Sequence, residues 1–266
     1  ENLIPQAENI YLNANEHGRA EKKLLNREER FGEELKARYT QHNFERAAPI
    51  MHELRVIKKQ IEVEQIQTAC NITRGAFDRV LQFIKPGVFE YEIEAELTHE
   101  FLTKRSSGPA YPSIIASGKD ACVLHYITNN KVCKEGDLIL MDFGAEYGNY
   151  ASDLTRTVPV SGKFTTRQKE VYQSVLSILK QSTALLYPGN TFEKYQKAVN
   201  SMVEEELIKL KLLNKNEILS QDPKNPLFKR YFMHGISHFL GLDVHDVGER
   251  TGIMKEGMIL TCEPGI

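Results

Sequence analysis

Two aspartates in the middle of the chain stand beside apolar, strand-like sequence. Asp142 directly follows the apolar residues 138–141, and Asp153 lies in a second β-rich run, residues 150–160. A carboxylate in such a place is expected to be buried, and a buried carboxylate needs a cation or a metal ion as its partner. We therefore expect the two aspartates on adjacent strands of one sheet, with both side chains directed at one point.

A second group of candidate residues lies near the end of the chain. His234, His238 and His245 fall in one short stretch, whose glycines allow the backbone to approach a ligand closely. Glu263 follows another apolar run, and His125 lies in an earlier β-type run. Together with the two aspartates, these residues are the candidates for the chemistry.

Three carboxylates and one imidazole, those of Asp142, Asp153, Glu263 and His238, stand in or beside apolar runs. Clustered buried acids repel one another and take up protons unless cations neutralise them. A ligand set rich in oxygen, with one imidazole and no thiolate, favours a hard divalent ion such as manganese, with cobalt or zinc as alternatives in vitro. Because carboxylates can bridge, the set suits two ions about 3.5–4 Å apart, the spacing typical of two-metal hydrolytic sites. Such a pair of ions can hold a hydroxide.

Other interpretations of these motifs are weaker. Residues 142–144 read Asp-Phe-Gly, as in protein kinases, but neither a glycine-rich loop nor a His-Arg-Asp motif precedes them. His234 and His238 have the i, i+4 spacing of a zinc-peptidase helix but lack its glutamate. Asp153 has an alternative partner in Arg156, with which it could form a structural ion pair. At the level of sequence this last alternative stays open.

Composition describes a globular protein. The chain has 266 residues, of which 41% are apolar, enough for one large domain or two modest ones with a real core. A net charge of −2 from well-mixed charged residues gives no reason to expect nucleic acid, an acidic substrate or a membrane surface as a partner. The four cysteines form no C-x-x-C pair, which is typical of reduced thiols in a cytoplasmic protein. No signal peptide or membrane-length apolar run is present.

The spacing of apolar residues predicts the elements that must position these side chains. Two helices come first, from residue 61 to the Pro-Gly step at 86–87 and through residues 93–101. Four β-type runs follow them, at residues 113–116, 122–127, 138–143 and 150–160.

The same order of elements then recurs. Helices are predicted over residues 171–186 and 195–210, a polar loop over 214–225, and β-type sequence over 232–246 and 258–266. Both halves carry a Pro-Gly step after their first helix, at 86–87 and 188–189. We therefore expect an α+β fold of two α-α-β halves. Pro-Gly is also a common helix stop, so duplication and coincidence both stay open.

The first 48 residues differ from the rest. They are polar and dense in charge, with a run at residues 19–38 that predicts a solvated helix, and the Ala48-Pro49 step disfavours helix and marks a boundary. The chain starts without methionine and stops just past an apolar run. We expect it to be part of a longer polypeptide, with sequence missing at both ends.

At the motifs described above, the sequence resembles the pita-bread metallopeptidases and, within them, the aminopeptidase P family. The resemblance is carried by residues 51–55, 124–126, 141–144, 152–157, 234–246 and 261–265. Residues 237–246 are especially typical of the proline-specific branch and much less so of methionine aminopeptidases. The resemblance implies a pita-bread fold in residues 49–266, with two pseudo-symmetric halves around a curved antiparallel sheet whose last strands lie beyond this chain. Residues 1–48 resemble the tail of that family's N-terminal domain plus a linker.

Position by position, the resemblance implies a ligand set. Asp142 and Asp153 bind metal, Asp153 bridges both ions, and His238 and Glu263 complete the visible shell. A fifth ligand, a second bridging glutamate, is expected beyond Ile266, so this chain alone is expected to lack a complete site and to be inactive by itself.

The resemblance also implies roles in catalysis. His125, His234 and His245 match histidines that hold the substrate and steady the tetrahedral intermediate, and Glu263 is suited to accept the proton of the attacking water as well as to bind metal. A hydroxide shared by the two ions would attack the carbonyl of the first residue.

The implied protein is a cytoplasmic, manganese-dependent Xaa-Pro aminopeptidase, which removes an N-terminal residue that precedes proline. By resemblance alone it would form a homodimer or homotetramer. Two alternatives stay open: a prolidase that cleaves only Xaa-Pro dipeptides, and a non-catalytic binding protein with the pita-bread fold.

Overall fold

The computed structural model describes residues 4–13 and 24–266. The chain divides into two units, Glu1–Val56 and Ile57–Ile266. In the smaller unit, a 3-10 turn, η1 (Ile4–Gln6), precedes two parallel strands, β1 (Asn9–Leu12) and β2 (Asn43–Arg46), and α2 (Ala48–Val56) follows them. Between the strands lies α1 (Arg27–Arg38).

Helix α1 starts later than the charge pattern predicted. The side chain of Asn26 accepts a hydrogen bond from the backbone N–H of Glu29, and the Glu29 carboxylate accepts one from the N–H of Asn26. This reciprocal cap supplies acceptors for backbone N–H groups that have none at a helix start, so the helix begins at Arg27. Residues 19–23 of the predicted helix lie outside the described residues.

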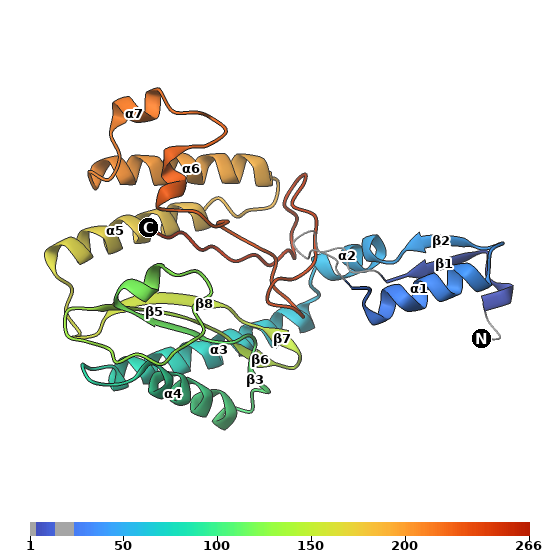
Figure 1. The fold of residues 1–266 in the computed structure, drawn as a ribbon, viewed down its shortest axis with the longest axis horizontal. Coiled ribbons are helices and arrows are strands. Elements are labelled where there is room, and N and C mark those ends of the chain that lie inside the picture. Colours follow the sequence, from blue (N-terminus) through green and yellow to red (C-terminus); the bar gives the residue numbers. More distant parts are fainter. Residues whose placement is uncertain (1–3, 14–23) are drawn as a thin grey trace. The chain divides into compact units, whose positions relative to one another are not determined.

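The first half of the larger unit confirms its two predicted helices. They are α3 (Gln60–Phe83) and α4 (Glu90–Thr103). The main sheet is antiparallel in the order β4-β5-β8, from β4 (Ile114–Ser117), β5 (Leu138–Phe143) and β8 (Leu154–Pro159). A second small antiparallel sheet has the order β3-β6-β7, from β3 (Gly108–Pro109), β6 (Ala145–Tyr147) and β7 (Tyr150–Ala151). In Figure 1 both helices lie along the same side of these strands.

Alternation along β5 decides which way Asp142 faces. Ile139, Met141 and Phe143 are fully buried and pack with α3 and α4 in one core. Successive side chains of a strand point to opposite faces, so Leu140 and Asp142 face away from that core. The helices therefore cover one face of the sheet, and Asp142 lies on the other face beside a smaller apolar cluster that includes Leu140 and Ile114.

The predicted strand at residues 122–127 is wrong. A 3-10 turn, η2 (Gly118–Cys122), ends there, and a loop follows in which His125 has a left-handed backbone with φ of 56°. Val123, Leu124 and Ile127 are all more than half exposed. A strand needs a hydrogen-bonded neighbour, and this apolar run has none among the described strands.

The second half begins with two helices, as predicted. They are α5 (Thr166–Thr183) and α6 (Phe192–Lys209), which lie beside each other in Figure 1. The predicted polar loop contains a short helix, α7 (Lys215–Leu219), and a 3-10 turn, η3 (Leu227–Arg230), follows it. Among the described helices, none is long and apolar enough to cross a membrane.

The predicted β sequence of the second half forms isolated bridges rather than strands. Residues 236–240 run antiparallel to residues 259–263, joined by the bonds Leu240 N–H to Ile259 O, Thr261 N–H to His238 O and Glu263 N–H to Ile236 O. The N–H of His238 donates to the hydroxyl of Thr261 at 3.0 Å. Because a side chain takes the place of a backbone acceptor, the ladder is interrupted.

Matching corners confirm the two-half architecture. The N–H of Gly87 donates to the carbonyl of Cys133 at 2.9 Å, and the N–H of Gly189 donates to the carbonyl of Met254 at 2.9 Å. Both glycines have left-handed backbones, with φ of 96° and 99°. Each Pro-Gly step follows the first helix of its half. Its glycine also bonds to a later segment of the same half, near Cys133 or Met254. Two unrelated helix stops would not be expected to share this second contact.

Candidate metal centre

Asp142 and Asp153 share a hydrogen-bond donor. Asp142 lies on β5 and Asp153 stands immediately before β8, its antiparallel neighbour. The hydroxyl of Tyr111 donates to Oδ1 of Asp142 at 2.6 Å and lies 3.1 Å from Oδ1 of Asp153. The two aspartates are therefore directed at one place, as expected from their positions in sequence.

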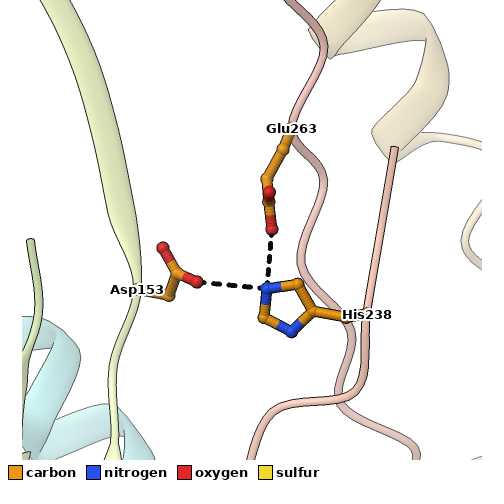
Figure 2. Close-up of side chains that lie close together, drawn as sticks. All are labelled: Asp153, His238 and Glu263. Carbon is orange, nitrogen blue, oxygen red and sulfur yellow. Dashed lines mark ion pairs between the residues drawn. The ribbon is translucent and has the colours of Figure 1, made fainter. Parts of the chain in front are cut away.

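His238 lies between acids from the two halves (Figure 2). Its Nε2 is 3.2 Å from Oδ2 of Asp153 and 3.0 Å from Oε1 of Glu263. One ligand atom from each of these three residues lies within 4.8 Å of the other two, so the three side chains could hold a metal ion.

The other ring nitrogen of His238 contacts the backbone. Nδ1 lies 2.8 Å from the carbonyl oxygen of Phe239, which can only accept, so Nδ1 carries the proton. In a neutral ring, Nε2 then presents its lone pair to two carboxylates. Burial lowers the pKa of His238, but the carboxylates of Asp153 and Glu263 outweigh it and raise the pKa to about 10. Without a metal ion, a proton on Nε2 of His238 lies between these two carboxylates and separates their charges.

Glu263 supplies the test of whether a cation fits. Its Oε1 is buried and receives no hydrogen bond from a described residue; its contact with Nε2 of His238 is an ion pair outside hydrogen-bond geometry. Burial raises the pKa of Glu263, whereas His238 and Thr261 lower it, and the net shift is downward. When the His238 ring is neutral, this buried and ionised oxygen faces the lone pair of Nε2 and a second carboxylate, an arrangement that fits a divalent ion.

Asp142 completes the acidic group. Burial raises its pKa to about 6; the hydrogen bond from Tyr111 opposes the shift, and the charges of Asp153 and Glu263 add to it. Carboxylates grouped without a cation raise one another's pKa, as expected for metal ligands when no metal ion is bound.

Two of the remaining candidate histidines, His234 and His245, lie beside the segments that carry His238 and Glu263. The rings of His238 and His245 are in edge-to-face contact, with centroids 4.4 Å apart. Nε2 of His234 lies close to Gly265, at 3.2 Å from where a Cβ would stand. Burial and the neighbouring ring of His238 lower the pKa of His245, against the charges of Asp153 and Glu263, which raise it. For His125 the described contacts show no link to these rings.

The alternative partner of Asp153 does not reach it. Arg156 is exposed and donates to the carbonyl of Thr155 at 2.7 Å. Residues 153 and 156 are an odd number of positions apart, so along an extended segment their side chains point to opposite faces. Asp153 pairs with His238 instead.

Sequence reasoning missed Tyr111. It stands in a loop between β3 and β4, outside every periodic run, and only its contacts with two acids mark it. Burial and the two aspartates raise the pKa of Tyr111 well above its ordinary value, so it stays a donor.

A repeat in the sequence was also missed. Lys134-Glu135-Gly136 precedes the run that ends at Asp142, and Lys255-Glu256-Gly257 precedes the run that ends at Glu263. This repeat could have identified the two acids as equivalent positions.

Comparison with known proteins gives one consistent answer. The sequence pattern of metallopeptidase family M24 matches residues 64–266. The Xaa-Pro aminopeptidase of Escherichia coli is 42% identical over 224 residues, which are 82% of this chain and 50% of that protein. This chain therefore spans about half the length of that curated relative.

Solved structures agree. A putative aminopeptidase P from Bacillus anthracis matches with a TM-score of 0.89 at 32% identity, over 99% of this chain and 62% of that one. Aminopeptidase P from E. coli, with the inhibitor Pro-Leu, matches with a TM-score of 0.77 at 38% identity, over 85% of this chain and 52% of that one. These likenesses confirm the predicted fold.

Proposed function

This chain belongs to metallopeptidase family M24, and from that premise we propose that the protein is an Xaa-Pro aminopeptidase, which releases the first residue of a peptide whose second residue is proline. The E. coli relative carries that name. The observation that supports the proposal best is the convergence of Asp153, His238 and Glu263 on one point from two halves of the chain.

The proposed cofactor is a pair of manganese ions. Asp142, Asp153, His238 and Glu263 would hold them. Divalent ions held here would lower the pKa of a water molecule and polarise the peptide carbonyl.

The residues of the chain then have separate tasks. The carbonyl of Phe239 holds the proton of His238 on Nδ1, which keeps Nε2 free to act as a ligand. Tyr111 orients both aspartates through one hydroxyl. Glu263 is suited to accept the proton that the attacking water loses, because its carboxylate is ionised and lies beside the other proposed ligands.

The histidines that are not ligands are assigned to the substrate. The lowered pKa of His245 keeps its ring neutral near pH 7, so it offers one N–H donor. We propose that His234 and His245 donate to the carbonyl region and to the proline residue of the peptide, and that His125 helps to hold the substrate.

Specificity for proline has a chemical reason. The bond that precedes proline has a tertiary amide nitrogen without N–H, so sites that bind a peptide N–H lose that contact. A pocket dedicated to this bond is then an advantage. The E. coli structure with Pro-Leu contains a ligand that begins with proline, as the second product of this reaction would.

The test uses the full-length protein loaded with Mn²⁺. Initial rates are measured for the tripeptide Gly-Pro-Gly, the dipeptide Gly-Pro and the control tripeptide Gly-Ala-Gly. We expect turnover of Gly-Pro-Gly, with Gly-Ala-Gly cleaved far more slowly. Turnover of the dipeptide alone would establish a prolidase instead. Full-length protein that binds no Mn²⁺ by calorimetry and cleaves none of the three would support a non-catalytic binding protein.

A further inference from the structure

A buried ion pair joins Lys58, just before α3, to Asp246, at the end of the segment that carries His238. Nζ of Lys58 is 2.8 Å from Oδ2 of Asp246, and each side chain is only 1% exposed. Removing two charges from water is costly, and the attraction between them repays this only with excellent geometry. None of the proposed chemistry uses either residue, so the pair needs another explanation.

Lys58 contacts two segments of the second half. It stands just before α3, and its backbone N–H donates to the carbonyl of Gly257 at 2.8 Å. Its side chain reaches Asp246. Gly257 precedes the segment that carries Glu263, and Asp246 ends the segment that carries His238. One residue therefore holds both segments that bring ligands from the second half.

Asp246 connects this pair to the ring of His238. The N–H of Asp246 donates to the carbonyl of Phe239 at 2.9 Å, and the same carbonyl accepts the proton on Nδ1 of His238 at 2.8 Å. Asp246 also follows His245, whose ring contacts that of His238. The backbone around Asp246 thus determines where the Phe239 carbonyl points, and with it the direction of Nε2 of His238.

Gly241 leaves the space that the Lys58–Asp246 ion pair occupies. A Cβ at Gly241 would lie 2.2 Å from Oδ2 of Asp246 and 3.0 Å from Cε of Lys58. Gly241 also accepts a hydrogen bond at its carbonyl from the N–H of Ala151, which lies just before Asp153. Only glycine at this position leaves room for the ion pair, so the turn and the pair depend on each other.

We infer that Lys58 and Asp246 are positioning residues for the metal centre: their buried ion pair fixes the 239–246 loop so that the Phe239 carbonyl holds Nδ1–H of His238 and directs Nε2 at Asp153 and Glu263. The inference rests on the proposed function, because it assigns the pair a task at the proposed ligand set.

The experiment measures metal binding by the full-length protein rather than turnover. Co²⁺ alone is added and followed by its visible absorption, which reports ligand geometry, and Mn²⁺ alone is followed by calorimetry. Lys58→Met keeps the length of the side chain and removes its charge. We expect Mn²⁺ to bind about 10- to 100-fold more weakly, as for other residues that orient a ligand, and the cobalt spectrum to change.

Two controls separate positioning from a general loss of stability. Lys209→Met removes the same charge from the ion pair with Glu206 on α6. Val203→Ala cuts a fully buried side chain of α6 and destabilises the fold without touching the centre. Both are expected to keep the cobalt spectrum and the Mn²⁺ affinity of the wild-type protein.

Three results would count against the inference. A folded Lys58→Met protein with wild-type affinity and spectrum overturns it while leaving the proposed function intact. If Lys58→Met does not fold, the double variant with Asp246→Asn, which leaves no buried unpaired charge, takes its place, and wild-type values there overturn it equally. Wild-type protein that binds neither metal ion overturns the inference and the proposed function together.

Discussion

Glu263 occupies in the second half of the larger unit the position that Asp142 occupies in the first. Each lies six residues after a left-handed glycine, Gly136 or Gly257, with φ of 87° and 85°. Each is paired across an antiparallel segment with an isoleucine: Asp142 lies opposite Ile114, and the N–H of Glu263 donates to the carbonyl of Ile236. Two acids at equivalent positions of facing halves place negative charge on both sides of one centre.

Metal binding should release a proton. The pKa of His238 is raised to about 10, so at pH 8 its ring is protonated, yet Nε2 must lose that proton to bind a metal ion. We expect Mn²⁺ to displace about one proton at pH 8 and its affinity to rise with pH up to about 10. Calorimetry in two buffers of different ionisation enthalpy measures the release. The control variant His99→Ala, on α4, should release the same number of protons. Equal heats in both buffers would contradict the prediction.

Removal of the shared donor should weaken the centre. Tyr111→Phe deletes the hydroxyl that contacts both Asp142 and Asp153. Because that hydrogen bond lowers the pKa of Asp142, its loss should raise the pKa above about 6. We expect about 10- to 100-fold weaker Mn²⁺ binding, with the largest loss near pH 6.

The matched control for Tyr111→Phe is Tyr150→Phe. The hydroxyl of Tyr150 donates to Oε1 of Glu62, on α3, at 2.9 Å, and Glu62 is not one of the proposed ligands. Its removal should leave Mn²⁺ affinity unchanged. Equal affinities for both variants and the wild-type protein would show that Tyr111 does not support the ligands.

A methyl group at residue 144 should disturb the segment that leads to Asp153. A Cβ at Gly144 would lie 1.8 Å from the carbonyl oxygen of Ser152, which is backbone and cannot move away cheaply. We expect Gly144→Ala to lower the free energy of unfolding by roughly 3 kcal/mol, measured with denaturant. Gly75→Ala, inside α3 where the nearest atom is 3.5 Å away, should instead raise it by about 1 kcal/mol. A neutral Gly144→Ala would contradict this account of the turn.

The loop that carries His125 should depend on one buried acid. Glu90 is fully buried and accepts hydrogen bonds from the hydroxyl and N–H of Ser117, the hydroxyl of Tyr126 and the N–H of Lys131. Tyr126→Phe removes one donor from that carboxylate next to His125. We expect the free energy of unfolding to fall by about 1.5–3 kcal/mol, because the bond involves a charged acceptor.

Activity should also fall in Tyr126→Phe. His125 is the preceding residue, and it would be held less firmly once residue 126 no longer bonds to Glu90. We expect the kcat for Gly-Pro-Gly to decrease more than KM changes. Tyr172→Phe is the control: its ring packs on Phe164, and its hydroxyl donates to no described residue. A Tyr126→Phe protein as stable as this control would show that Glu90 does not hold the loop.

Helices and strand ends could be predicted from the sequence because their signals are local. Apolar spacing predicted a helix up to the Pro-Gly step at 86–87, and α3 ends shortly before that step, at Phe83. An apolar run followed by an acid predicted β5 and Asp142. Residues 122–127 are also rich in apolar side chains, but the strand predicted there is wrong. A strand needs a hydrogen-bonded neighbour, and the local sequence does not show whether one is present. Tyr111 had no local signal at all.

The sequence by itself predicted which side chains would bind metal, since three acids and one histidine beside apolar runs favour a cation as their partner. The tertiary structure alone decided how they are held: which acids Nε2 of His238 faces, which hydroxyl joins Asp142 to Asp153, and that Lys58 pairs with Asp246 across 188 residues of chain. The physical reason is that hydrogen bonds and ion pairs form between atoms that folding brings together. Local pattern records burial, but it does not record the partner.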